Sequence, residues 1–215
     1  MSRSSLFYHE QLYRTNAVMN RIREFPVTLC GAGALGANLA ENLARAGFGQ
    51  MRIVDRDRIE ERNLSTQPYL RSDIGAFKAK IMANVLYRAV GITVDARPEE
   101  LSERNAAKLL QESALVLDTF DNSAGRQAVQ TTCARLSIPC LHVGLATDYA
   151  EILWNEVYRV PSSARDDFCD YPLARNLVMM PTAVAGEVVI AFAARGEKRS
   201  YTLTLGDFAV REYRP

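Results

Sequence analysis

A glycine-rich turn between two predicted elements constrains the fold of this chain more than any other feature of its sequence. Residues 25–30 (FPVTLC) are apolar and rich in strand-forming side chains, which is typical of a buried strand. The pattern GxGxxG follows at once, at Gly31, Gly33 and Gly36, and leads into leucines at helical spacing. A second apolar segment, 51–54, comes next. Strand, tight turn, helix and strand in this order predict a Rossmann-type unit.

This turn is suited to binding a phosphate group. Its glycines let backbone N–H groups approach a ligand closely, and the N-terminus of the following helix adds a favourable partial positive charge. Asp55 directly follows the second strand, where a carboxylate accepts hydrogen bonds from ribose hydroxyls. We therefore expect a nucleotide here. The turn alone does not distinguish the dinucleotide of a dehydrogenase from the ATP of an adenylating enzyme.

Short apolar segments alternate with helical ones up to about residue 145. We expect further strands over 92–96, 114–118 and 139–143, and further helices over 1–23, 74–88, 102–112 and 123–136. After Gly144 the pattern becomes strands over 152–157, 201–205 and 209–213, with an apolar helix over 180–194. The predicted fold is α/β: a Rossmann-like doubly wound sheet, mostly parallel, with an antiparallel C-terminal extension.

A single domain of residues 1–215 suits this length and pattern. We expect an N-terminal helix in 1–24, a nucleotide-binding core in 25–145 and a substrate or dimer region in 146–215. The net charge is +1, with no basic tract to attract nucleic acid or an anionic membrane. No apolar run approaches the roughly 20 residues of a membrane span. We therefore expect a cytoplasmic protein that binds neither nucleic acid nor a membrane.

The glycine turn is the first of several motifs that occur in a fixed order. It is followed by DRD at 55–57, NLSTQ at 63–67, DIGAFK at 73–78 and DTFDN at 118–122. In order and spacing these motifs resemble those of the ThiF/HesA/MoeB family of ubiquitin-activating-enzyme-like adenylating proteins. The resemblance extends from about residue 13 to about residue 144. It implies ATP and Mg²⁺ as cofactors, and it favours ATP over a dinucleotide at the turn.

The resemblance implies a role for each motif. Asp55 would bind the adenosine ribose, Asn63 and Lys78 would contact phosphates, and Asp121 would hold Mg²⁺. These roles agree with the chemistry, because adenylation concentrates negative charge on phosphate oxygens, which a lysine or a carboxylate-bound Mg²⁺ stabilises. Asn122 either joins this site or caps the following helix. The expected nucleotide-binding residues are Gly31, Gly33, Gly36, Asp55, Asp57, Asn63, Gln67, Lys78, Asp121 and Asn122.

The sequence departs from the family pattern at Thr66, where the family has an arginine that contacts ATP phosphates. Threonine keeps a hydrogen-bond donor but lacks the charge, which Arg62 or Arg71 would have to supply. A second family arginine reaches the ATP of the partner subunit from near the N-terminus, and Arg14 is its best match. If Arg14 has this role, the protein is a homodimer with two composite sites, and Arg14 joins Asn63, Lys78 and Asp121 as a catalytic residue.

The cysteines are few and unpaired in sequence. None of the four belongs to a CxxC pair, so we expect no zinc. Cys30, Cys133 and Cys140 are expected in the core. Cys169 lies in a polar segment and is a candidate nucleophile that would accept a thioester or persulfide. The neighbouring carboxylates of Asp167 and Asp170 disfavour its thiolate, which favours a structural role.

Three functional hypotheses follow. The first is ATP-dependent adenylation of the C-terminal carboxylate of a small ubiquitin-like or sulfur-carrier protein or of a peptide. The second is a catalytically weak or inactive subunit of the same fold beside an active partner, which Thr66 favours. The third is an NAD-dependent oxidoreductase, which explains the glycine turn and Asp55 but leaves Asn63, Lys78 and Asp121 without a role.

Overall fold

The computed structural model describes residues 6–161 and 173–214. One eight-stranded sheet has the order β3-β2-β1-β4-β5-β6-β7-β8. The strands are β1 (Val27–Cys30), β2 (Met51–Val54), β3 (Val94–Arg97), β4 (Leu115–Asp118), β5 (Cys140–Ala146), β6 (Tyr149–Trp154), β7 (Ser200–Thr204) and β8 (Ala209–Tyr213). Strands β1 to β5 pair in parallel, and β6, β7 and β8 extend the sheet antiparallel. The predicted fold class is therefore confirmed.

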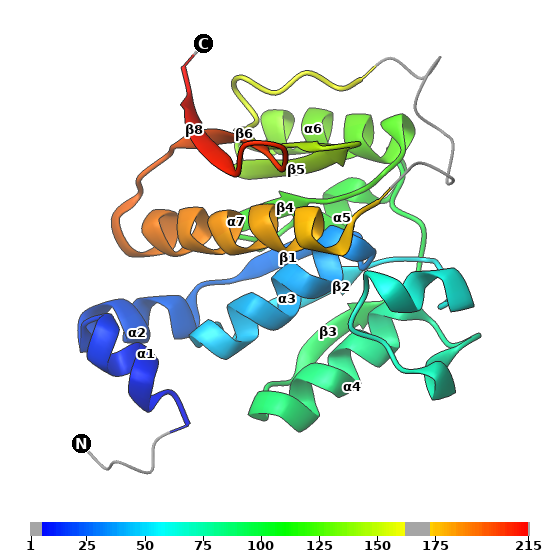
Figure 1. The fold of residues 1–215 in the computed structure, drawn as a ribbon, viewed down its shortest axis with the longest axis horizontal. Coiled ribbons are helices and arrows are strands. Elements are labelled where there is room, and N and C mark those ends of the chain that lie inside the picture. Colours follow the sequence, from blue (N-terminus) through cyan, green and yellow to red (C-terminus); the bar gives the residue numbers. More distant parts are fainter. Residues whose placement is uncertain (1–5, 162–172, 215) are drawn as a thin grey trace.

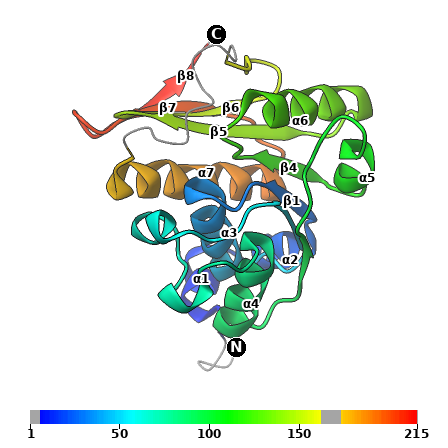
Figure 2. The same cartoon turned by 90° about the vertical axis from the view of Figure 1, so that its right-hand side faces the viewer.

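Helices cover both faces of this sheet (Figures 1 and 2). The α-helices are α1 (Tyr8–Tyr13), α2 (Asn16–Glu24), α3 (Ala34–Ala46), α4 (Lys78–Val90), α5 (Ala106–Leu110), α6 (Ser123–Leu136) and α7 (Arg175–Arg195). Two 3₁₀ helices, η1 (Glu61–Ser65) and η2 (Arg71–Asp73), lie between β2 and α4. Helices α2, α3, α4 and α7 pack on one face, and α5 and α6 pack on the other.

The central strands are buried because helices enclose them from both sides. All four residues of β1 and all four of β4 are buried, as expected for apolar strands of a parallel sheet. The three cysteines predicted in the core, Cys30, Cys133 and Cys140, are free thiols and buried. The two strands lie side by side, with Cys30 paired to Asp118 in register. The glycine turn after β1 and the DTFDN motif after β4 therefore meet at one end of the sheet.

The prediction of one N-terminal helix was wrong, because the segment forms two helices, α1 and α2. Arg14 between them has an extended backbone (ψ 146°). The Thr15 hydroxyl accepts a hydrogen bond from the Val18 N–H (3.4 Å) and so caps α2. A threonine favours this capped start over a continuous helix, because its hydroxyl satisfies an N–H group that has no partner within the helix.

Several other predicted boundaries moved; the strand expected over 152–157, for example, is β6 at 149–154, and two helices start later than expected. The helix expected from residue 74 begins at Lys78, because Gly75 adopts a left-handed backbone (φ 88°) and its N–H donates to the Ile59 carbonyl (2.8 Å). The helix expected over 102–112 shortens to α5, because Asn105 Oδ1 accepts a hydrogen bond from the Ser102 N–H in a preceding turn (2.8 Å). Both changes come from side chains and glycines that favour turns.

Helix α7 begins earlier than the expected 180–194 and contains Pro181 near its start. Among the described residues, α7 is the one helix whose length and hydropathy would suffice to cross a membrane, and more than half of its most apolar part is buried inside the domain. Its buried side packs against α3, β5, β6 and β7. A helix buried in the core of a globular domain can be equally long and apolar, so these two properties do not indicate a membrane span.

Candidate nucleotide site

The Asp55 carboxylate accepts a hydrogen bond from the backbone of the glycine turn and so stabilises its conformation. Its Oδ2 accepts a hydrogen bond from the Ala32 N–H (2.6 Å), and its Oδ1 accepts one from the Asp57 N–H (2.7 Å). The side chain is buried, which raises the pKa of Asp55, while Lys78 and these N–H groups oppose that rise. A carboxylate has further lone pairs, so these bonds leave capacity to accept from a ribose hydroxyl. The structure thus places Asp55 beside the turn, where the sequence predicted it.

The three positions of the turn differ in whether the fold requires a glycine there. A Cβ at Gly36 would lie 2.0 Å from the Gly31 carbonyl oxygen and 2.5 Å from Thr119 Oγ1, so only glycine fits. Gly31 has a left-handed backbone (φ 101°). Gly33 has neither constraint: its φ is −78°, and nothing lies within 4 Å of a Cβ there. The fold requires Gly36, whereas the open space at Gly33 is available for a ligand.

This difference predicts opposite effects of two alanine substitutions. We expect Gly36→Ala to destabilise the fold by about 1–3 kcal/mol or more, because the added methyl group overlaps backbone atoms. Gly33→Ala should keep the melting temperature within a few degrees but weaken ATP binding, because the methyl group fills the open space. Thermal unfolding and calorimetric titration with ATP measure the two effects. Wild-type ATP affinity in a folded Gly33→Ala variant would contradict the assignment of this space to a phosphate.

Two side chains that the sequence analysis did not single out hold the turn in place. The Thr119 hydroxyl, just after β4, donates to the Cys30 carbonyl oxygen (2.9 Å). The Tyr69 hydroxyl donates to the Ala32 carbonyl oxygen (2.7 Å), and burial raises the pKa of Tyr69. The carbonyl oxygens of Cys30 and Ala32 therefore have hydrogen-bond partners within the protein, so the conformation of the turn is fixed before any ligand binds.

Lys78 brings a positive charge to this end of the sheet. It is the first residue of α4 and is 8% exposed. Its backbone N–H donates to the Asp57 carbonyl oxygen (2.9 Å), and its Nζ lies 3.3 Å from Asp57 Oδ2. Its charge also acts on the Asp55 carboxylate. The predicted residues Asp55, Asp57 and Lys78 therefore gather beside the glycine turn.

The NLSTQ motif packs against the start of α3. The Thr66 carbonyl oxygen accepts a hydrogen bond from Asn38 Nδ2 of α3 (2.8 Å). Asn63 Oδ1 accepts one from the Glu60 N–H (2.9 Å), and Asn63 Nδ2 makes no hydrogen bond within the described residues. Gln67 is 8% exposed, and its Oε1 has no partner there either. A buried acceptor without a donor is costly, which is consistent with a ligand that supplies one.

Thr66 itself is buried and brings no charge to the site. The two arginines proposed to compensate lie in ion pairs on the surface of the same loop. Arg62 Nε lies 2.6 Å from Glu60 Oε2, and Arg71 Nη2 lies 3.8 Å from Glu61 Oε1. Both arginine side chains are more than half exposed. Lys78 is therefore the buried cation of this part of the site.

The DTFDN motif ends β4 and starts α6. Asn122 Oδ1 accepts a hydrogen bond from the Gly125 N–H (2.7 Å), so of the two roles expected for Asn122 the structure shows the helix cap. Asp121 precedes it and is exposed, and its carboxylate makes no hydrogen bond or ion pair within the described residues. Those residues contain no group of three or more metal-ligating side chains. Mg²⁺ bound with ATP commonly uses one or two carboxylates with phosphates and water, so Asp121 alone suits it.

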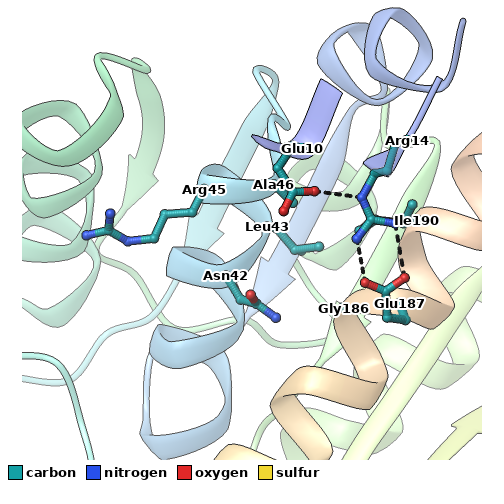
Figure 3. Close-up of a pocket in the computed structure, with 9 residues that line it drawn as sticks. All are labelled: Glu10, Arg14, Asn42, Leu43, Arg45, Ala46, Gly186, Glu187 and Ile190. Carbon is teal, nitrogen blue, oxygen red and sulfur yellow. Dashed lines mark hydrogen bonds and ion pairs between the residues drawn. The ribbon is translucent and has the colours of Figure 1, made fainter. Parts of the chain in front are cut away.

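Arg14 lies at the other end of α3 from the glycine turn (Figure 3). Its Nη1 donates to Glu187 Oε2 (3.1 Å) and its Nε donates to Glu10 Oε2 (2.7 Å). The Glu187 bond raises the pKa of Arg14. Both ion pairs line a cavity of about 130 Å³ together with Asn42 of α3. Asn42 is about 12 Å along the helix from Ala34, so the structure does not bring Arg14 to the turn of its own chain.

A buried polar network beside the site was not predicted from sequence. His142 Nδ1 lies 2.7 Å from Asp118 Oδ2, and its ring stacks on that of Tyr158 (3.8 Å between centroids). Arg126 Nη1 donates to the Tyr158 hydroxyl (2.9 Å) and lies 3.6 Å from Asp118 Oδ2. Asn155 Oδ1 lies 2.8 Å from His142 Nε2. The available signal was Arg126, a charged residue four positions after Asn122 on the face that α6 turns to the sheet.

Comparisons with known proteins agree with this geometry. The sequence profile of the ThiF family matches residues 8–159. The sulfur carrier protein adenylyltransferase of Thermus thermophilus is 32% identical over 138 residues, which are 61% of this chain and 51% of that protein. The sulfur carrier protein ThiS adenylyltransferase of Bacillus subtilis is 30% identical over 133 residues, 60% of this chain and 40% of that protein. The chain therefore spans about half the length of these relatives, or less.

A solved structure shows the same fold over nearly the whole chain. E. coli MccB with ATP has a TM-score of 0.81 and 18% sequence identity, covering 99% of this chain and 72% of that one. At this identity the similarity concerns the fold. Cys169, the candidate nucleophile, lies outside the described residues.

Proposed function

The chain belongs to the ThiF family, and from that premise we propose that it is an adenylyltransferase that uses ATP to activate a C-terminal carboxylate. The acceptor is the tail of a small ubiquitin-like or sulfur-carrier protein, or of a peptide. The observation that carries this proposal is the open space over Gly33, in the turn that Asp55 supports, together with the buried side chain of Lys78, whose charge acts on Asp55. A phosphate in that space meets backbone N–H groups, a helix N-terminus and a cation.

The proposed reaction needs positioning and charge more than proton transfer. A carboxylate oxygen of the acceptor forms a bond to the α-phosphorus of ATP, and the bond from that phosphorus to the bridging oxygen breaks. Pyrophosphate leaves and an acyl adenylate remains. The carboxylate is already ionised near neutral pH, so no general base is required. Lys78 and Asn63 Nδ2 are the groups we assign to phosphate oxygens, where negative charge accumulates.

Asp121 is the residue we assign to Mg²⁺. Its carboxylate is exposed at the end of β4 and is not used by the fold. When bound, the ion neutralises phosphate charge and favours departure of pyrophosphate. Asn122 caps α6 and holds the backbone that presents Asp121.

We propose a homodimer in which Arg14 acts on the nucleotide of the other subunit. Arg14 lies far along α3 from the turn of its own chain, at the side of the domain formed by α1, α3 and α7. A second copy docked on that side would bring a glycine turn toward it. The ion pairs with Glu10 and Glu187 fix the guanidinium group before assembly.

Pyrophosphate exchange tests the function directly. Wild-type protein with Mg²⁺, ATP and labelled pyrophosphate should exchange label when supplied with small carrier proteins that end in a free glycine carboxylate. Asp121→Ala should lose exchange by about 10²-fold or more. Asp148→Ala is the matched control, because Asp148 is also an exposed aspartate at this end of the sheet, in the turn between β5 and β6. Exchange by Asp121→Ala at the wild-type rate would contradict the role of Asp121.

A second candidate is a ThiF-fold subunit without activity of its own, and Thr66 favours it. Thr66 is buried and uncharged at the position where the family has a phosphate-contacting arginine. ATP binding without exchange, for every carrier supplied, would support this candidate. Calorimetric preference for NAD over ATP would instead support a dinucleotide-dependent enzyme.

A further inference from the structure

One face of the antiparallel part of the sheet, opposite the face that α7 covers, carries a row of aligned residues. Gly144 of β5 pairs with Glu151 of β6, Glu151 pairs with Thr202 of β7, and Thr202 pairs with Arg211 of β8. Residues directly opposite one another share a face, so these four lie side by side. We call them the tail row. The other face of β6 and β7 is filled by Ala150, Ile152 and Leu203, which pack in the core with α7.

The tail row leads from the sheet edge to the candidate site. Asp118, the last residue of β4, pairs with His142, and Gly144 lies two residues further along β5. Asp121 follows the end of β4 at the same end of the sheet. Strands are about 4.8 Å apart, so a row across four strands spans about 14 Å, which about four residues of an extended chain cover. A tail lying along the row would point its carboxylate toward the end of the sheet where Asp121 lies.

Glu151 is the chemically distinct member of the row. It is half-buried, and its carboxylate makes no hydrogen bond or ion pair within the described residues. A Cβ added to Gly144 would lie 3.5 Å from its Oε1 and 3.4 Å from Arg126 Nη2, so both charged groups lie close to this buried glycine. Burial raises the pKa of Glu151, and the charge of Arg126 opposes that rise. A partly desolvated carboxylate without a direct partner favours a ligand that supplies a cation.

The neighbouring arginines do not supply that partner. Arg126 is 8% exposed, and its guanidinium donates to the Tyr158 hydroxyl (2.9 Å) and to the Val143 carbonyl oxygen (3.1 Å). Arg211 lies two strands away and pairs with Asp207 (2.5 Å). Both guanidinium groups are therefore held by other groups of the fold.

We propose that Glu151 is a specificity-determining residue that selects acceptors with a lysine or arginine among the last residues before the terminal carboxylate. The inference rests on the proposed function, since it names the chemistry of the acceptor tail. The tail lies extended along the accessible part of the tail row, from Arg211 past Thr202, and places its cationic side chain against Glu151. Specificity then comes from a charge complement outside the nucleotide site.

Binding of synthetic peptides tests this directly and does not depend on catalysis. The probes are hexapeptides with a fluorescent N-terminus and a free C-terminal glycine, identical except for lysine, norleucine or glutamate at each of the four preceding positions. Fluorescence polarisation should show that wild-type protein prefers lysine over norleucine by about tenfold at one position, as a charge-assisted hydrogen bond provides. Glu151→Gln should remove most of that preference, and Glu151→Lys should reverse it in favour of glutamate.

The control variant is Glu212→Gln. Glu212 pairs with Tyr201 on the opposite face of β8, so its substitution should leave the preference unchanged. No discrimination between lysine and norleucine by the wild type, no peptide binding, or an unaltered preference in Glu151→Gln would each overturn the inference. ATP binding, measured separately by calorimetry, distinguishes the two proposals. A lysine preference that depends on Glu151 in a protein that does not bind ATP would support this inference and contradict the proposed function.

Discussion

Replacing Lys78 by alanine should lower the rate of pyrophosphate exchange by about 10²–10³-fold, the effect of removing one preorganised group that stabilises developing charge. Lys78 is the buried cation beside the glycine turn, and the surface arginines of the NLSTQ loop lie in ion pairs of their own. Because Thr66 brings no charge, no neighbouring side chain of that motif compensates for the loss. The effect should therefore be larger than in a site with two phosphate-binding cations.

Lys80→Ala is the matched control for this prediction. Lys80 lies two residues further along α4 and is exposed, so its removal should change exchange less than twofold. Lys78→Met keeps most of the packing of the aliphatic chain and separates charge from volume. The ion pair of Lys78 with Asp57 has one exposed partner, so its loss should cost at most about 1 kcal/mol of stability. Equal exchange rates in the Lys78 and Lys80 variants would contradict the assigned role.

Replacing Asp118 by asparagine should reduce the free energy of unfolding by about 3–5 kcal/mol, the usual cost of removing one partner of a buried ion pair. The Asp118 carboxylate is fully buried, 2.7 Å from His142 Nδ1 and 3.6 Å from Arg126 Nη1. Without it, the guanidinium group of Arg126 is left buried without its closest balancing charge. Urea unfolding monitored by circular dichroism measures the loss. Asp148→Asn, at an exposed position, should change stability by less than about 0.5 kcal/mol.

The pH dependence of that difference provides an independent check. Burial opposes ionisation of Asp118, but Arg126 and the hydrogen bond to His142 outweigh it and hold the pKa of Asp118 below its usual range. For an acid with a lowered folded pKa, the stabilisation is complete above the unfolded pKa, about 3.9 for aspartate, and is lost as the pH falls through the folded pKa. The stability difference between wild type and Asp118→Asn should therefore be constant near neutrality and shrink below about pH 4. A difference that grows in acid would contradict this account.

The sequence by itself determined the fold class and the positions of the motifs. Apolar segments of strand length, helical spacing and the glycine turn are local patterns, because each depends on the conformation of neighbouring residues. For the same reason the boundaries of α6 were predicted correctly, and Asn122 takes the capping role, one of the two expected for it. Motif order placed Asp55, Asp57 and Lys78 at one end of the sheet, because the carboxyl ends of parallel strands meet there.

Only the tertiary structure decided which of these residues support the fold and which remain available to a ligand. Gly33 and Gly36 belong to one pattern, yet only at Gly36 would a Cβ overlap other atoms, and those atoms belong to Gly31 and Thr119. The network that joins Asp118, Arg126 and His142 combines a strand end, a helix and a second strand. Such contacts depend on sheet order and register, and side chains far apart in sequence meet only when the strands pair. Burial and hydrogen bonding, and so the role of each charge, are therefore properties of the folded chain.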